Sequence, residues 1–343
     1  MKYTKSQQNV AKIARRILAQ MLIVAIIAPM SIFLSSNSLA TYVGDRRITS
    51  ATAVVIDYET GQIIYGHNAD VPRVPASMTK LLAVAVVLDA IEDGRISFDT
   101  RVYTSYNISN FSMDRRYSNV PMAVGSAYSV RHLIDAVMLR SAGAATVALA
   151  ELLYGNETAF IRRMNAKVIE YGLVGEFHDS WGISADTRIS AYYMAQLARA
   201  IIYEHPIILE IASRTTMSHN NIAMNNTNTL LGNYYGLDGL KTGFTNAAGW
   251  CFVGTAMRDG RRIIAVTMGS SDRDVRFTDS TILLNYGFAN FNRAFARHFR
   301  SEIANVDNGV TFASALVPIS LYNDVEHREL FSFYELVEML NDG

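Results

Sequence analysis

The dipeptide Asp259-Gly260 stands between two apolar runs, residues 250–257 and 262–268. An Asp-Gly pair in this setting is the strongest short signal for a β-hairpin, because both residues tolerate the positive φ of a tight turn. Near the start of the chain, residues 53–56 predict a buried strand and residues 62–65 its returning partner. The sequence therefore places strand pairs at both ends of one domain.

The segment between these strand pairs is helical in pattern. Residues 81–88 are apolar on every side and predict a central, buried helix. Further helices are predicted over residues 130–140, 144–153, 157–171, 189–203 and 279–288. This order predicts an α+β fold, in which the first and last strands of an antiparallel sheet meet and helices pack on the sheet.

Composition limits the function classes. Half of the 343 residues are hydrophobic and 18% are charged, which suits one sizeable domain plus a smaller appendage. The formal net charge is zero and no basic footprint is visible, so we expect no nucleic-acid partner. The seven histidines lack metal-binding spacing and no phosphate or dinucleotide motif occurs, so we expect neither metal nor cofactor. Cys251 is the only cysteine, which excludes an internal disulfide.

The amino-terminal segment predicts export. Five basic residues and no acidic residue occur in the first 40 positions, where an apolar stretch covers residues 17–34. Ser38 and Ala40 then supply the small residues that a signal peptidase needs. Gln20 and Pro29 interrupt the apolar stretch, so we favour a signal peptide over residues 1–40, cleaved after Ala40, over a retained anchor. The protein is expected at the extracytoplasmic face of the cell membrane or in the cell wall space.

Ser77 stands three residues before Lys80 at the start of the predicted central helix. Residues with this spacing share one helical face, so the lysine amine can take the proton that makes a serine hydroxyl nucleophilic. Burial, and a second cation at Lys241, would lower the pKa of Lys80 and favour its neutral form. Alone this pattern is weak, because a helix start with a solvated lysine gives the same letters.

Two further motifs follow in order, Ser141-Ala142-Gly143 and Lys241-Thr242-Gly243. The ordered set matches the signature of penicillin-binding proteins and serine β-lactamases, except at the end of the middle motif. Over residues 48–291 the chain resembles a D-alanyl-D-alanine carboxypeptidase of the low-molecular-weight penicillin-binding protein family. The resemblance also includes residues 147–151, 228–231, 236–243 and 248–251.

The resemblance implies a β-lactamase/transpeptidase-like architecture, in which helices, including a helical subdomain, flank the antiparallel sheet. We assign residues 41–289 to the D,D-peptidase domain and residues 290–343 to a short C-terminal tail, interpreted as a truncated form of the family's β domain. Residues 329–340 predict an amphipathic helix with an acidic face, which anionic lipid repels. Membrane contact is therefore expected only through the N-terminal segment, if it is uncleaved.

The resemblance also assigns roles to the first two motifs. Ser77 would attack a peptide carbonyl, Lys80 would accept its proton, and Ser141 would relay that proton toward the leaving amine. Ser141 also suits the N-cap of the following helix, and both roles are compatible.

The third motif would bind substrate. Lys241 and Thr242, on an edge strand, would bind the terminal carboxylate of the substrate. Gly243 lets backbone and substrate approach closely. The backbone amides of Ser77 and Phe244 would form the oxyanion hole.

The implied function is that of a serine-type D-Ala-D-Ala carboxypeptidase, which trims peptidoglycan stem pentapeptides through an acyl-enzyme and is acylated by β-lactam antibiotics. An alternative is a catalytically degenerate member of the family that binds peptidoglycan or penicillin without turnover. A β-lactamase is less favoured, because no glutamate is assignable to activate a deacylating water.

Two departures from the family pattern bear on activity. The middle motif usually ends in Asn, but Gly143 has no side chain. The chain offers Asn107, Asn119 and Asn228 as substitutes for the missing amide, and Gly143→Asn should raise activity if that amide limits it. Secondly, the chain reads Trp181-Gly182-Ile183 where the family often has His-Gly-Leu. We expect Trp181 to fill core rather than line the pocket.

Overall fold

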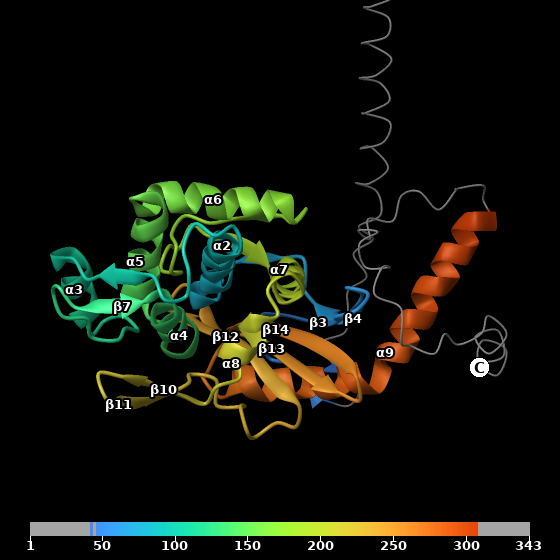
Figure 1. Ribbon diagram of the computed structural model, residues 1–343. Helices are drawn as coiled ribbons and strands as arrows, with labels where there is room; N and C mark the ends of the chain where they lie inside the picture. Colours follow the sequence, from blue (N-terminus) through green and yellow to red (C-terminus); the bar gives the residue numbers. More distant parts are fainter. Residues whose placement is uncertain (1–41, 44–45, 308–343) are drawn as a thin grey trace, which may run out of the picture. The chain divides into compact units, whose positions relative to one another are not determined.

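The computed structural model describes residues 42–43 and 46–307 (Figure 1). The predicted signal peptide and residues 308–343, including the predicted acidic helix, lie outside the described residues. Across the part of the chain that is described, no helix combines the length and the apolarity needed to cross a membrane.

The central sheet has five antiparallel strands in the order β12-β13-β14-β3-β4. Their bounds are β3 (Thr52–Asp57), β4 (Ile63–His67), β12 (Leu237–Thr245), β13 (Gly249–Arg258) and β14 (Arg261–Ser270). Strand β14 pairs with β3, so the first and last strands meet as predicted. The turn between β13 and β14 holds Asp259 and Gly260 at φ 47° and 75°, which confirms the Asp-Gly hairpin. Strand β12 lies at one edge of the sheet.

Helices cover both faces of this sheet. Their bounds are α2 (Lys80–Glu92), α3 (Tyr106–Met113), α4 (Val130–Arg140), α5 (Gly143–Tyr154), α6 (Glu157–Glu170), α7 (Ala191–Glu204), α8 (Ile207–Ala212) and α9 (Val275–Asp307). Figure 1 shows α2 and α7 on one face and the first part of α9 on the other. The α+β prediction is therefore confirmed.

Short elements join these layers. They are the 3-10 helix η1 (Ala76–Thr79) and the strands β1 (Tyr42–Val43), β2 (Arg46–Arg47), β5 (Pro72–Arg73), β6 (Arg101–Tyr103), β7 (Ala127–Ser129), β8 (Gly175–Glu176), β9 (Arg188–Ser190), β10 (Thr216–His219) and β11 (Ile222–Asn225).

The two faces of β3 explain its unbroken apolar sequence. Val54 and Ile56 pack into a large core with α2 and the other helices of that face. Ala53 and Val55 point to the other side and pack into a second core with residues of α9. Alternate side chains of a strand point to opposite faces, so a strand buried on both faces has no polar positions.

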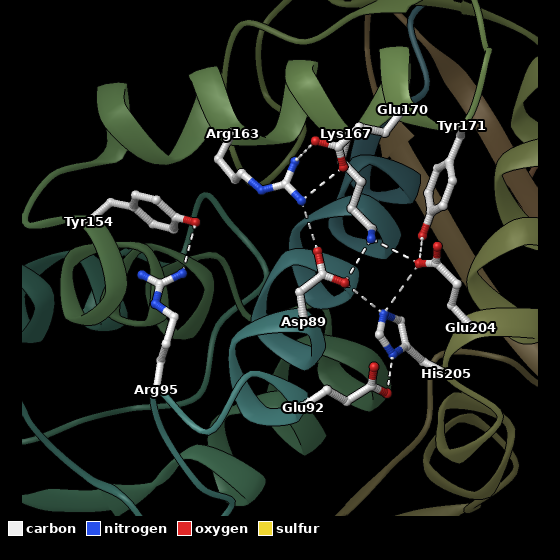
Figure 2. Close-up of polar contacts among 10 residues, drawn as sticks. All are labelled: Asp89, Glu92, Arg95, Tyr154, Arg163, Lys167, Glu170, Tyr171, Glu204 and His205. Carbon is white, nitrogen blue, oxygen red and sulfur yellow. Dashed lines mark hydrogen bonds and ion pairs between the residues drawn. The ribbon is translucent and has the colours of Figure 1, made fainter.

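Helix α2 is buried over residues 80–88, as its sequence predicts, and contacts α4, α5, α6 and α7. An ion network anchors its carboxyl-terminal end (Figure 2). Asp89 of α2 accepts bonds from Lys167 (2.7 Å) and Arg163 (3.1 Å) of α6. His205, directly after α7, contacts Asp89 at 3.0 Å and Glu92 at 2.8 Å. The network therefore fixes α2 against two neighbouring helices.

The last helix differs most from its predicted bounds. Residues 279–288 were expected, whereas α9 runs over Val275–Asp307. The sequence contains no glycine or proline between Gly287 and Gly309, so nothing ends the helix earlier. Residue 290, where we placed the start of the tail, lies inside this helix.

Candidate active site

Ser77 and Lys80 lie at the junction of η1 and α2. Lys80 Nζ donates a hydrogen bond to Ser77 Oγ over 2.9 Å. The Lys80 side chain is 1% exposed, and burial lowers its pKa to about 7, although the Asp179 carboxylate opposes this shift. Burial is the cause that the sequence suggested, whereas Lys241 is not among the causes for Lys80. A substantial share of the amine is therefore neutral at neutral pH, as a general base requires.

A tight turn after α6 holds the lysine from another side. The carbonyl of Trp181 accepts a second hydrogen bond from Lys80 Nζ. Asp179 Oδ2 accepts bonds from the backbone amides of Gly182 (2.6 Å) and Ile183 (2.7 Å), which fixes this turn. Gly182 has φ +86°, and any side chain there would overlap the carbonyl of Ala76. The glycine thus lets the turn approach Ser77 closely.

Ser141 occupies a strained backbone position. It ends α4 with φ 60° and ψ 32°, a left-handed conformation that costs a non-glycine residue free energy. The N-cap of α5 is Ala142, so the predicted N-cap role of Ser141 is wrong. Its Oγ is buried and has no hydrogen-bond partner. Leaving a buried hydroxyl without a partner costs free energy. Because no protein group occupies this oxygen, it can exchange a proton with a ligand.

Strand β12 approaches Ser77 through Gly243. The first carbon of a side chain at this position would lie 2.9 Å from Pro75 O and 3.2 Å from Ser77 N. Only glycine allows this approach, and the next residue, Phe244, lines the same cavity as Ser77. The Phe244 ring is 44% exposed and stacks on Trp250 with centroids 4.1 Å apart.

The charged end of the site lies deeper than the sequence suggested. Lys241 is 1% exposed, and its Nζ donates to Thr242 O over 3.1 Å. Burial, and then the positive charges of Lys80 and Arg276, lower the pKa of Lys241 well below its usual value. A bound carboxylate would raise that pKa again, because a neighbouring opposite charge favours the protonated amine.

Arg276 is a site residue that sequence reasoning missed. It lies in the first turn of α9, is 4% exposed, and donates to Gly243 O over 3.1 Å. Its guanidinium lies over the ring of Trp250, and burial lowers its pKa to about 10. The feature that marks Arg276 as a site residue is its buried guanidinium, whose Nε has no hydrogen-bond partner. This feature is visible in the fold and not in the sequence.

These elements enclose a cavity of about 690 Å³. Of the predicted site residues, it is lined by Ser77, Lys80, Ser141, Thr242, Gly243 and Phe244, whereas Lys241 lies behind the lining. The arginines at the cavity are Arg116, Arg140, Arg273 and Arg276, and no described residue of the lining carries a carboxylate. Such a cavity favours an anionic ligand.

None of the three asparagines proposed as substitutes replaces the missing amide. Asn119 bridges Phe111 O and the amide of Ala144, both over 2.8 Å. Asn228 is buried and donates to the backbone of β12, and Asn107 is exposed on α3. No member of this trio lines the cavity.

The expectation for Trp181 is also wrong. It is partly exposed and lines the cavity rather than filling core. The turn that carries Trp181 faces the cavity, so the indole lies at the cavity wall and packs there on aromatic neighbours.

Within the described residues, one group of metal-ligating side chains comes together, away from this cavity. Ligand atoms of Asp89, Glu204 and His205 lie within 4.8 Å of one another. The Lys167 ammonium already bonds Asp89 and Glu204, over 2.7 and 2.9 Å (Figure 2). The group is therefore organised as an ion network around a lysine.

Solved structures that superpose on this chain include penicillin-binding proteins. Penicillin binding protein 5 from Haemophilus influenzae superposes with a TM-score of 0.69 at 32% identity, over 72% of this chain and 73% of that one. Penicillin-Binding Protein D2 from Listeria monocytogenes, solved with ampicillin bound, gives a TM-score of 0.64 at 30% identity, over 71% and 99%. The fold and the site thus define a protein of the penicillin-binding class.

The family follows from the sequence profile of D-alanyl-D-alanine carboxypeptidases, which matches residues 39–272. The chain belongs to this family. The carboxypeptidase DacD of Salmonella typhimurium is 34% identical over 270 residues, which is 75% of this chain and 67% of that protein. DacF of Bacillus subtilis is 29% identical over 246 residues, 70% of this chain and 62% of that protein. The chain thus spans about two thirds of the length of these relatives.

Proposed function

We propose that this protein is a serine-type D-Ala-D-Ala carboxypeptidase that trims peptidoglycan stem pentapeptides and is acylated by β-lactams. The observation that carries the proposal is the contact of Ser77 Oγ with a buried lysine whose pKa is lowered to about 7. Family membership supports the same reaction and substrate.

The first step is acylation. Ser77 Oγ attacks the carbonyl carbon of the penultimate D-Ala, and its proton passes to Lys80 Nζ. The resulting oxyanion is held by the backbone amides of Ser77 and Phe244, a role that the close approach of Gly243 to Ser77 N supports. Losing such a donor typically costs about 10²–10³ in rate.

Cleavage of the C–N bond completes acylation, and hydrolysis of the acyl-enzyme follows. The C–N bond breaks as the proton moves from Lys80 through the unpartnered Ser141 Oγ to the leaving amine. The free carboxylate of the leaving D-Ala is held by the Thr242 hydroxyl and the charges of Lys241 and Arg276. Water then cleaves the acyl ester and restores Ser77.

We also propose that residues 1–40 direct export and that the enzyme works in the extracytoplasmic cell wall space. Its substrate, the peptidoglycan stem, lies on that side of the membrane. Membrane contact through an uncleaved N-terminal segment remains part of this proposal.

A labelling experiment tests the function. Fluorescent penicillin should label the wild-type protein covalently, and mass spectrometry should place the adduct on the peptide that contains Ser77. Ser77→Ala should remain unlabelled, and the wild type should release D-Ala from a pentapeptide analogue. Equal labelling of both proteins would contradict the assignment of the nucleophile.

The same assay separates the alternatives. Labelling without D-Ala release would favour a degenerate binding protein, which the missing amide at Gly143 suggests. Penicillin turnover well above the rate of D-Ala release would indicate a β-lactamase. The described cavity lining holds no glutamate to activate a deacylating water, which supports the carboxypeptidase.

A further inference from the structure

Gly143 is required by space and not by backbone conformation. It begins α5 without a positive φ, so its conformation suits any residue. The first carbon of a side chain there would lie 2.9 Å from Trp181 Cε3 and 3.0 Å from Phe111 Cζ. Real side chains essentially never tolerate the shorter distance, so the indole occupies the volume into which a side chain at position 143 would extend.

The indole belongs to an aromatic group. Its ring lies 4.9 Å from that of Phe111 and 5.0 Å from that of Tyr117, centroid to centroid. Trp181 and Tyr117 line the cavity, whereas Phe111 and Gly143 do not and therefore back the indole from behind. A ring held in this way is a fixed wall of the cavity.

This wall lies beside the reacting atoms. Lys80 Nζ is 5.7 Å from the centroid of the indole and is also bonded to the Trp181 carbonyl. The same amine contacts Ser77 Oγ at 2.9 Å. An acyl group on Ser77 is therefore within reach of the aromatic wall. Lys241 and Arg276, which suit a terminal carboxylate, come from β12 and α9, whereas the Arg116 guanidinium lies over the outer ring of the wall, 5.5 Å from the centroid of Tyr117.

We propose that Trp181 and Tyr117 form an apolar subsite that binds an apolar or aromatic group on the acyl-donating side of the substrate. Gly143 is the residue that makes room for this subsite, and Trp181 determines its specificity. The inference rests on the acyl-enzyme function proposed above. It reverses the expectation for Gly143→Asn, because the added side chain would push the indole into the cavity and lower acylation.

Two β-lactams test the subsite. Benzylpenicillin carries an aromatic acyl side chain, and 6-aminopenicillanic acid lacks it. We expect Trp181→Leu to lower the ratio of their acylation rate constants about three- to tenfold, the usual worth of one aromatic contact. If Trp181→Leu does not fold, Trp181→Phe should lower the ratio in the same direction. An unchanged ratio in a folded variant overturns the inference.

The matched control is Trp250→Leu, which changes an indole that lines the same cavity beside β12. It should change both rate constants by the same factor and leave their ratio unchanged. A fall of the ratio in this control alone would place the apolar group beside β12 and overturn the inference.

A double-mutant cycle tests the role of Gly143. Gly143→Ala should lower the acylation rate constant for benzylpenicillin in the wild type and should cost less in the Trp181→Leu background, because the two positions are in contact. Equal costs in both backgrounds would show that Gly143 does not act through the indole.

The outcomes separate this inference from the proposed function. Acylation of Ser77 with an unaltered ratio in Trp181→Leu leaves the function standing and removes the subsite. If neither compound acylates the wild type, the proposed function fails, and the subsite is then tested by calorimetric binding of the same two compounds to both proteins. Preferential binding of benzylpenicillin that Trp181→Leu abolishes would support it, and equal binding would overturn it.

Discussion

At the scale of single residues, the proposed chemistry depends on how one amine is buried. Lys80 is surrounded by Ser77, a backbone carbonyl and apolar helices, so its charged form is poorly solvated. The Asp179 carboxylate opposes the resulting fall of the pKa, and the same carboxylate fixes the turn that carries Trp181. One acidic residue therefore both orients this turn and raises the pKa of the proposed base.

The pKa of Lys80 predicts a pH profile. Only the neutral amine accepts a proton, so the acylation rate constant should rise with pH through about 7 and level off above it. Asp179→Asn keeps an acceptor for the turn but removes the negative charge that raises this pKa. Its inflection should lie at lower pH than that of the wild type, as measured with benzylpenicillin between about pH 5 and pH 9. Coincident inflections would contradict the role of Asp179.

At the scale of elements, Asn119 joins α3 to the start of α5. Its side chain donates to Phe111 O and accepts from the amide of Ala144, so it braces the backbone on both sides of the aromatic wall. Asn119→Ala would leave both groups without partners and should cost about 1–3 kcal/mol of unfolding free energy. Chemical denaturation measures this loss.

Asn119→Asp is the matched variant for this brace. It keeps the acceptor for Ala144 at a helix N-terminus, where a negative charge is favourable, and should recover part of the loss. If the alanine variant is as stable as the wild type, the two hydrogen bonds of Asn119 contribute nothing to the free energy of unfolding, and water replaces them.

The elements themselves were largely predictable. Helix α4 has the predicted bounds, and the hairpin at Asp259 follows from two residues that tolerate positive φ. The position of β12 at the sheet edge was expected as well. Local pattern sufficed in these cases, because each signal lies within a few residues of the structure it specifies.

The remainder depended on contacts between distant segments. Arg276 lies 33 positions after Gly243, to which it donates, and no local pattern distinguishes it from a surface arginine. The wall formed by Trp181 was missed for the same reason, since its partners come from α3, the loop after α3 and the start of α5. The left-handed backbone conformation of Ser141 also could not be predicted, because serine has no special preference for it.

At the scale of the whole molecule, the ion network at the far end of α2 couples the helical layer to pH (Figure 2). His205 is 1% exposed and lies within hydrogen-bond distance of Asp89 and Glu92. Burial alone would lower its pKa, but the hydrogen bonds and charges of these two carboxylates raise it above 6.5. Glu204 adds a third negative charge 3.7 Å away, and Lys167 a positive one on the same Asp89.

A raised pKa stabilises the folded protein where the imidazole is protonated. The contribution is fully present below the unfolded value of about 6.5 and is lost as pH rises through the higher folded value. We expect His205→Gln, which does not titrate, to be less stable than the wild type by about 1–3 kcal/mol at acid pH, and the difference to shrink at alkaline pH. His178→Gln is the control, because His178 is 40% exposed beside Glu176 and should show little effect. Unfolding by denaturant at several pH values measures both. A stability difference for His205→Gln that does not vary with pH would show that this histidine acts through packing and not through its charge.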